Sequence, residues 1–211
     1  MSNKGGRTAP GSSPGRVAVR RRLPVDRRRE QLIALGLDLF STRGYEEVSA
    51  EEIAERGGIS RGLLYHYFPT KRDFFVAVAK AASLQVAALT QPDPALPAEA
   101  GVRQAIGRFL SYAETHPHGF LATYRGSVAG DAEVRAVVEE AWRRHEERIL
   151  LLLAPGVEPS PLLRMAVRGW LAFAREVTAV WLESRLAPGE RIIDLLQAVL
   201  FAVVRAAGSS Q

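Results

Sequence analysis

The chain has 211 residues, of which 47% are hydrophobic and 24% are charged, so it can form one or two globular units with a buried core. It contains no cysteine, which excludes a disulfide scaffold, a thiolate metal site and a cysteine nucleophile. Its net charge of +5 is unevenly distributed, since residues 1–29 carry +8 and the remainder carries −3.

The N-terminal segment, residues 1–24, is basic, rich in Gly, Ser, Pro and Arg, and without apolar periodicity, which predicts a disordered arm. No apolar run follows these charges, so no secretory signal is expected, and no stretch approaches the roughly 18 apolar residues of a membrane span. We therefore expect a soluble, cytoplasmic protein with no membrane partner. The positive charge indicates either a polyanionic partner, such as the minor groove of DNA, or a solvated tail.

Two helices are predicted in the next 35 residues. The first runs from about Val25 to Arg43, because apolar residues recur at helical spacing and Gly44 is a natural stop. Ser49, followed by Glu52, is a capping-box signature that opens a second helix, and the glycine pair beginning at Gly57 ends it.

Two more helices follow directly. Ser60 is a good N-cap for a third helix, which runs to Tyr67 or the next residue and ends before Pro69. Thr70 can cap a fourth helix, which is rich in apolar residues and extends over Lys71–Leu89.

Beyond this region every readable segment is helical, with Pro and Gly at the breaks. Five further helices are expected at about residues 98–115, 117–126, 131–153, 159–185 and 188–206. There is no alternating strand pattern and no internal repeat. The predicted fold is all-α with about nine helices, divided into a basic disordered arm (1–24), a helix-turn-helix unit (25–70) and a helical C-terminal domain (71–211).

The segment Ser49–Lys71 has the pattern of two short helices joined by a glycine-containing turn, and such a unit can place its second helix in the major groove of DNA. Arg61, in the first turn after the Ser60 cap, can make a paired contact to guanine. Gly62 allows close approach of the backbone, and Leu63 can touch a thymine methyl group. These side chains indicate a base-reading edge.

The remainder of that helix has two other kinds of side chain. Tyr65 and Tyr67 can donate to phosphate oxygens, and Lys71 lies where an ammonium and a helix N-terminus can bind the same phosphate. Leu64 and Phe68 are four residues apart and should face inward, against Ile53, Ala54 and Ile59. A helical hairpin that never binds DNA is the alternative interpretation of this pattern.

Three stretches carry a resemblance to a known family: LFSTRGYEEVS at the end of the first helix, the turn IAERGGIS, and LLYHYFPTK leading into the fourth helix. Over Arg28 to about Val78, their order and spacing resemble the TetR family of transcriptional regulators. The resemblance implies a homodimer with an N-terminal three-helix DNA-binding domain and an all-α C-terminal domain for dimerisation and small-molecule binding. Most members of that family are repressors released by a ligand.

By position, the resemblance implies two sets of contacts in the third helix and just after it: base-facing Arg61, Gly62 and Leu63, and phosphate-facing Tyr65, Tyr67 and Lys71. Ser49 matches the cap of the second helix near the DNA backbone. Glu51 and Glu52 depart from the family pattern, because members often have basic or neutral residues there. We expect the Glu52 side chain to be used in the cap of the second helix, and Glu51 to weaken a phosphate contact.

In the C-terminal domain the resemblance implies that the last two helices pair with their copies in a dimer; an intramolecular core is the alternative. Small and branched apolar residues suitable for such a seam are Leu171, Ala174, Thr178, Leu195, Val199 and Val203.

A ligand pocket in a helical bundle is mostly apolar with a few polar groups, and a cavity of several hundred Å³ would favour a ligand-responsive protein. The candidates to line it are Phe109, Tyr112, Phe120, Tyr124, Trp142, Trp170, Phe173 and Glu176. For each of them ordinary core packing is the alternative, and for Glu176 a salt bridge with Arg168 or Arg175.

The sequence offers no catalytic or metal-binding pattern. His66, His116, His118 and His145 do not have the spacing of a metal site, and neither nucleophile nor phosphate-loop motifs occur. We therefore predict no enzyme, no metal and no other cofactor. The expected protein is a dimeric repressor released from a palindromic operator by a small hydrophobic ligand. The alternatives are a ligand-independent or activating regulator of the same fold, and a helical interaction module that binds nucleic acid non-specifically.

Overall fold

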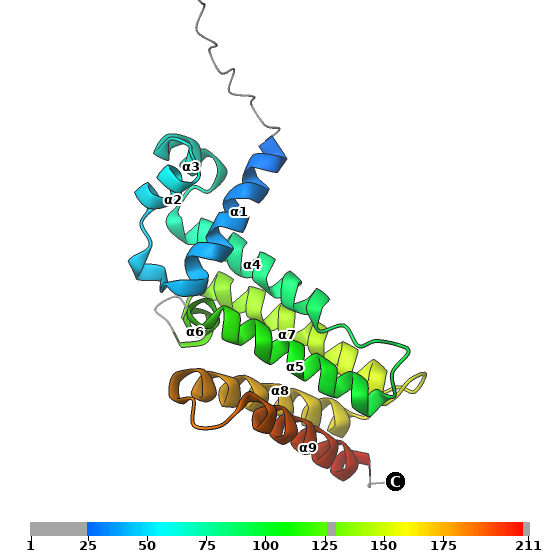
Figure 1. Ribbon diagram of the computed structural model, residues 1–211. Helices are drawn as coiled ribbons and strands as arrows, with labels where there is room; N and C mark the ends of the chain where they lie inside the picture. The colour runs from blue at the N-terminus through cyan, green and yellow to red at the C-terminus, as the bar shows by residue number, and fades with distance from the viewer. Residues whose placement is uncertain (1–24, 126–129, 209–211) are drawn as a thin grey trace, which may run out of the picture.

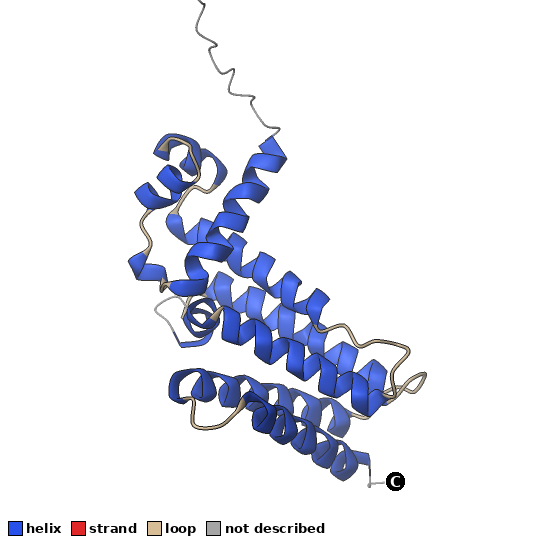
Figure 2. Ribbon diagram, in the orientation of Figure 1, coloured by secondary structure: helices blue, strands red, loops and turns tan. Residues whose placement is uncertain are grey.

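The computed structural model describes residues 25–125 and 130–208, and within these ranges it contains nine α-helices and no strand (Figure 1, Figure 2). The helices are α1 (Val25–Thr42), α2 (Ala50–Arg56), α3 (Arg61–Tyr67), α4 (Lys71–Leu89), α5 (Ala98–Thr115), α6 (Pro117–Arg125), α7 (Ala132–Leu153), α8 (Pro161–Ser184) and α9 (Gly189–Gly208). The predicted all-α fold with about nine helices is confirmed. The basic arm of residues 1–24 lies outside the described residues.

A short 3-10 helix, η1 (Tyr45–Glu47), follows α1, and the sequence did not predict it. The start of α2 also differs from the expected capping box. The Ser49 Oγ accepts a hydrogen bond from the Glu52 N–H at 3.1 Å, which satisfies one free donor of the first turn. The Glu52 carboxylate does not close the box, because it pairs with the guanidinium of Arg43.

The third and fourth helices begin where their caps predict. The Ser60 Oγ accepts a hydrogen bond from the Leu63 N–H at 3.2 Å. At the start of α4, Thr70 and Asp73 form a complete capping box, with backbone-to-side-chain bonds of 3.0 and 2.9 Å. These caps are local, so they fix the short turn that separates α3 from α4 without help from the rest of the fold.

The first hydrophobic core joins α1, α2 and α3 to the N-terminal half of α4 and to the start of α7. Phe68 packs edge-on against Phe74, with ring centroids 5.0 Å apart. Gly36 lets α1 approach α4 closely, since a Cβ at that position would lie 2.3 Å from a methyl group of Val78 and 2.7 Å from the Phe74 ring. The helix that follows α3 is therefore packed tightly against α1.

The second core lies among α5 to α9, and Figure 1 shows α8 and α9 at the opposite end of the molecule from α1 to α3. Three residues expected in a dimer seam, Leu171, Ala174 and Thr178, lie inside the protomer and are almost fully buried there. For these three the intramolecular alternative is correct, because they face α5, α7 and α9 rather than the outside. In the described part of the chain, no helix is long and apolar enough to cross a membrane.

Candidate DNA-binding surface and ligand cavities

The packing of α3 determines which of its side chains remain outside. Leu64 and Phe68 are each 2% exposed and belong to the same core as Ile53 of α2. The prediction that these two side chains face inward is therefore confirmed. Because their inward face is fixed at a four-residue spacing, the other faces of α3 are turned toward solvent.

The predicted base-reading edge lies on one of these outer faces. Arg61, Gly62 and Leu63 are all exposed, and Leu63 has 39% of its surface accessible. A Cβ placed on Gly62 would meet no atom within 4 Å. The edge thus has open space in front of it, as a helix needs in order to enter a groove.

The Arg61 guanidinium is already engaged in local contacts. Its Nη1 lies 2.5 Å from Glu51 Oε1, its Nη2 donates a long bond of 3.4 Å to the Tyr65 hydroxyl, and the group sits 5.4 Å from the centre of the Tyr65 ring. The Tyr65 hydrogen bond and then the Glu51 charge raise the pKa of Arg61, so the side chain stays charged. Glu51, expected only to weaken a phosphate contact, therefore also holds Arg61.

Lys71 is positioned by a residue that sequence reasoning missed. Its Nζ donates to the backbone oxygen of Tyr45 at 3.0 Å and lies 4.1 Å from the centre of the Tyr45 ring. An ammonium has three donors, so two remain for a phosphate. Tyr65 and Tyr67 are half-buried, while Ser49 and Ser60 are exposed at the helix starts.

Arg29 is a second residue that the sequence did not single out. Its guanidinium lies 5.1 Å from the centre of the Phe68 ring, so the exposed start of α1 reaches the end of α3. The signal for it was the run of arginines from Arg27 to Arg29, which opens α1. This contact adds positive charge at the C-terminal end of α3.

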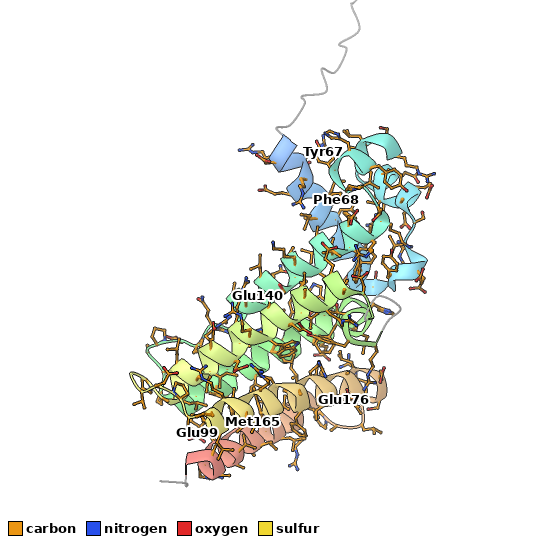
Figure 3. All side chains as sticks on the ribbon, turned by 180° about the vertical axis from the view of Figure 1, so that it is seen from behind. Tyr67, Phe68, Glu99, Glu140, Met165 and Glu176 are labelled. Atoms are coloured by element: carbon orange, nitrogen blue, oxygen red, sulfur yellow. The ribbon has the colours of Figure 1, made fainter. Side chains whose placement is uncertain are left out.

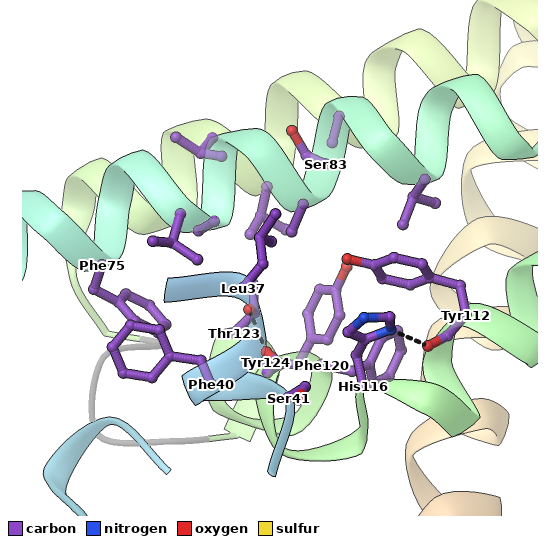
Figure 4. A pocket seen from close by; sticks show the side chains of 18 of the residues that line it. Leu37, Phe40, Ser41, Phe75, Ser83, Tyr112, His116, Phe120, Thr123 and Tyr124 are labelled. Atoms are coloured by element: carbon purple, nitrogen blue, oxygen red, sulfur yellow. Dashed lines mark hydrogen bonds between the residues drawn. The ribbon is translucent and has the colours of Figure 1, made fainter. Parts of the chain in front are cut away.

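The residues that the structure describes form two apolar cavities that share a wall. The first has a volume of about 100 Å³ and is enclosed by α1, α4, α5, α6 and α7 (Figure 4). The second, of about 80 Å³, lies among α5, α7, α8 and α9. Both are smaller than the several hundred Å³ expected of a ligand pocket. They share three wall residues, Phe109, Trp142 and His145.

The structure brings six of the eight candidate ligand residues to these cavities. The first cavity is lined by Phe109, Tyr112, Phe120, Tyr124 and Trp142. The second is lined by Phe109, Trp142 and Trp170, and Trp170 Nε1 donates to the Leu196 backbone oxygen at 2.8 Å.

Phe173 and Glu176 line neither cavity. Phe173 is exposed on α8, and the Glu176 carboxylate forms a surface ion pair with Arg125 of α6 (Figure 3). The salt bridge considered for Glu176 thus has a different partner from the two expected. Arg168 pairs with Glu146 instead, and Arg175 lies 5.5 Å from the centre of the Tyr124 ring.

Three polar side chains of the cavity walls, Tyr112, Tyr124 and His145, are uncharged near neutral pH, whereas Arg148 in the wall of the second cavity is a cation. Burial raises the pKa of Tyr124, and it raises the pKa of Tyr112 to about 12. Burial, followed by repulsion from Arg148, lowers the pKa of His145 to about 4. Trp142 Nε1–H is buried near the Tyr124 hydroxyl without completing a hydrogen bond to it. Among the residues described, no group of His, Asp and Glu is placed to hold a metal ion.

Comparison with known proteins identifies the family. Residues 32–78 match the model of bacterial regulatory proteins of the tetR family, and residues 99–203 match a tetracyclin repressor-like C-terminal domain. A solved tetR-family transcriptional regulator from Streptomyces coelicolor is 33% identical, with a TM-score of 0.82, over 90% of this chain and 85% of that one. The chain belongs to the TetR family. It is a DNA-binding transcriptional regulator, and not an enzyme.

Two more distant proteins also resemble the chain, one in sequence and one in fold. The HTH-type transcriptional activator FasR of Mycolicibacterium smegmatis is 26% identical over 171 residues, which cover 77% of this chain and 76% of FasR. The regulator FadR from Bacillus subtilis, solved in complex with stearoyl-CoA, shares the fold with a TM-score of 0.63 at 19% identity. That match covers 83% of this chain and 97% of FadR.

Proposed function

We propose that this regulator is a cytoplasmic repressor that leaves a palindromic operator when a small apolar or amphipathic ligand binds its C-terminal domain. The observation that carries the proposal is the composition of the first cavity wall. Leu37 and Phe40 of α1 and Phe75 and Val86 of α4 line it together with residues of α5 to α7. A ligand there would contact α1 and α4, which share a hydrophobic core with α3. If the ligand binds one arrangement of these helices more tightly than another, it can shift the position of α3.

The size of the cavities sets a condition on the ligand. Because each is small, a ligand of ordinary size must displace the side chains of Phe109, Trp142 or His145 that separate them. Apart from Arg148, both walls are formed mostly by apolar side chains, which favour a ligand with an apolar body. FadR offers a precedent within the same fold, since that protein was solved with stearoyl-CoA.

We further propose that α3 is the recognition helix. Arg61, Gly62 and Leu63 face the bases, while the phosphates are bound by Ser49, Ser60, Tyr65, Tyr67 and Lys71. The exposure of the first three and the two free donors of the Lys71 ammonium support this division.

The proposed dimer uses an exposed apolar stripe on the last two helices, which includes Met165 of α8 (Figure 3). At helical spacing along α8, the large exposed side chains are Leu162, Met165, Phe173 and Val180, and Leu195 of α9 is also exposed. Glu176, which pairs with Arg125, lies on the same face of α8. Exposed small residues, among them Gly169 and Ala172, allow close approach. Pairing of two copies there would present two α3 helices to successive major grooves, which are about 34–36 Å apart.

The experiment that tests this function measures release. DNA sites are first selected from a random library with the full-length protein, and binding to a labelled selected site is followed by fluorescence anisotropy. Addition of apolar and amphipathic compounds should weaken binding to that site by at least about fivefold for one chemical class. If compounds that raise the melting temperature of the protein leave operator affinity unchanged, ligand-induced release is contradicted.

A second candidate is an activator of the same fold. FasR, which is 26% identical, is a transcriptional activator, and this favours the candidate specifically. In vitro transcription from a promoter carrying the selected site separates the two. Added protein should lower transcription if it is a repressor and raise it if it is an activator.

A further inference from the structure

Arg148 of α7 has an unusual set of partners for a partly buried arginine. Its Nη1 donates to the Ala87 backbone oxygen at 2.6 Å and to the Thr90 hydroxyl at 3.4 Å. Within residues 25–125 and 130–208 it forms no ion pair with a carboxylate, whereas Arg143 and Arg144 on the same helix both pair with Glu140. A buried guanidinium with only neutral acceptors is incompletely compensated for its lost hydration.

Arg148 also lines the second cavity, on the same wall as Thr90 and His145. The rest of that wall is almost entirely aliphatic and aromatic. Burial and repulsion from Arg144 lower the pKa of Arg148, and both effects would be relieved by a negative charge placed beside it. The cavity thus combines one cation with an apolar surround, which is the arrangement that suits an acid with an apolar body.

The wall between the two cavities supplies a second donor. Trp142 lines both cavities, and its Nε1–H is buried without a completed hydrogen bond. An indole N–H can only donate, and so can a guanidinium. Arg148 uses only Nη1 for its two hydrogen bonds, so Arg148 Nη2 and Nε and Trp142 Nε1 can still donate to an oxygen acceptor. A molecule that bound Arg148 and extended past Trp142 would enter the first cavity.

We propose that the second cavity binds the carboxylate of an elongated, otherwise apolar acid, with Arg148 as its anchor and the chain passing Phe109 and Trp142 into the first cavity. This inference rests on the proposed ligand response and adds to it the charge of the ligand and the place where it binds. A carboxylate can accept two parallel bonds from a guanidinium, and such charge-assisted bonds are about twice as strong as bonds to neutral acceptors.

Binding of a carboxylate by Arg148 would also affect α4. Arg148 and Arg108 together hold the C-terminal end of that helix, since Arg108 Nη1 donates to the backbone oxygens of Leu89 and Gln91 at 3.3 Å each. Backbone oxygens at a helix end lack partners within the helix, so these arginines stabilise it. When a carboxylate binds Arg148, the hydrogen bond from Arg148 to the end of α4 is lost, and the bonds from Arg108 remain. The opposite end of that helix begins directly after α3.

Arg108 provides a matched control, because it makes the same kind of contact to α4 but lines neither cavity. Calorimetric titration of the full-length protein with decanoate and with decanamide compares an acid with its neutral counterpart. The wild type and Arg108→Gln should bind decanoate at least about tenfold tighter than decanamide. Arg148→Gln should bind the two compounds equally. Equal binding by the wild type, or an equal loss of preference in both variants, would overturn the proposal.

Further outcomes separate this inference from the proposed function. If decanamide binds the wild type as tightly as decanoate and both release DNA, the ligand response stands and the anchor is wrong. If neither compound binds, the acid anchor is contradicted, whereas the ligand response is contradicted only when no compound of the screen releases DNA. Should Arg148→Gln fail to fold, Arg148→Lys serves in its place. It retains the charge but not the paired geometry, so decanoate should bind it several-fold more weakly than the wild type, and an unchanged affinity would count against the anchor.

Discussion

Arg61 Nη1 on α3 lies 2.5 Å from Glu51 Oε1 on α2, so the arginine that we propose to contact a base is held by an acid of the preceding helix. The two side chains are 59% and 61% exposed, and an ion pair so open to water contributes little to stability. The effect of the pair therefore falls mainly on DNA binding. Glu51 orients Arg61, and its negative charge opposes the approach of phosphates.

The first prediction separates these two effects of Glu51. Glu51→Gln removes the charge but keeps an oxygen that can accept from Arg61, so affinity should rise severalfold for all DNA sequences with base preference unchanged. Anisotropy titrations on the selected site and on random DNA measure both quantities. Glu99→Gln, at the distant start of α5, is the charge-matched control. Lower affinity in Glu51→Gln would show that the intact ion pair is needed.

Arg61→Ala should act on sequence preference. Loss of a paired contact to one base is expected to relax discrimination at one position in each half-site by about 1–3 kcal/mol. Binding to substituted operators, compared position by position, measures this. Lys71→Ala should instead weaken binding to every sequence and reduce the slope of log affinity against log salt by about one.

Lys71 also holds Tyr45, so the melting temperature of Lys71→Ala has to be measured alongside its DNA affinity. If the two alanine variants change sequence preference and salt dependence in the same way, the division of α3 into base-facing and phosphate-facing residues is wrong.

Gly36→Ala tests the close contact of α1 with α4. The new methyl group would overlap Val78 and Phe74, both nearly fully buried, so we expect a net destabilisation of about 1–3 kcal/mol. This outweighs the gain of up to about 1 kcal/mol from replacing a helical glycine. Gly62→Ala, where the methyl group has open space, should not destabilise the fold. Urea unfolding at fixed protein concentration measures both, and similar values for the two variants would contradict the packing argument.

Met165→Glu tests the exposed stripe on α8. Met165 is 66% exposed in the protomer, and a carboxylate there would lose its hydration on pairing of two copies. The variant should be monomeric by light scattering and bind its operator roughly 100-fold more weakly. Leu151→Glu, an equally exposed position on α7 outside the stripe, is the control. A dimeric Met165→Glu would place the dimer contact elsewhere.

His145 predicts a pH dependence of stability. Burial, with repulsion from Arg148, lowers its pKa from 6.5 to about 4 in the folded chain. The unfolded chain therefore binds a proton first as the pH falls, and the stabilisation present above pH 6.5 is lost progressively down to pH 4. The free energy of unfolding should fall by at most about 1.4 kcal/mol per pH unit in that range, and less in His145→Leu.

The pH window is specific to this group. Arg72 lowers the pKa of Asp131 from 3.8 to about 2. Asp131 therefore makes the free energy of unfolding depend on pH only when the pH falls close to 3.8 and below. Equal slopes between pH 6.5 and 4.5 in the wild type and in His145→Leu would contradict the assignment to His145.

The parts of the fold that the sequence predicted are those with a local cause. Ser49, Ser60 and Thr70 mark helix starts because each side chain binds the backbone three residues later, and Leu64 and Phe68 reveal their buried face by spacing alone. The charged pairs were not predictable in this way. Glu52 pairs with Arg43 and does not complete the helix cap, and Glu176 pairs with Arg125 on another helix. Tertiary packing brings these groups together, so neither pair follows from local sequence.

The candidate sites show the same division. The aromatic residues of α5, α6 and α7 were recognisable as cavity lining, but the role of Arg148 depends on the position of the α4 end, which no pattern within α7 indicates. Likewise, Leu171 and Phe173 are two residues apart on α8, yet one is buried and the other exposed. Only the packing of α8 against α9 and α5 decides which face of that helix is left for a partner.

The most direct test of this account is quantitative footprinting of the full-length protein on its own genomic DNA. The account predicts a protected palindrome whose half-site centres are about one helical turn apart, with protection lost when a ligand binds and reduced sequence preference in Arg61→Ala. Uniform coating of DNA without a preferred site, unchanged by Arg61→Ala, would contradict it.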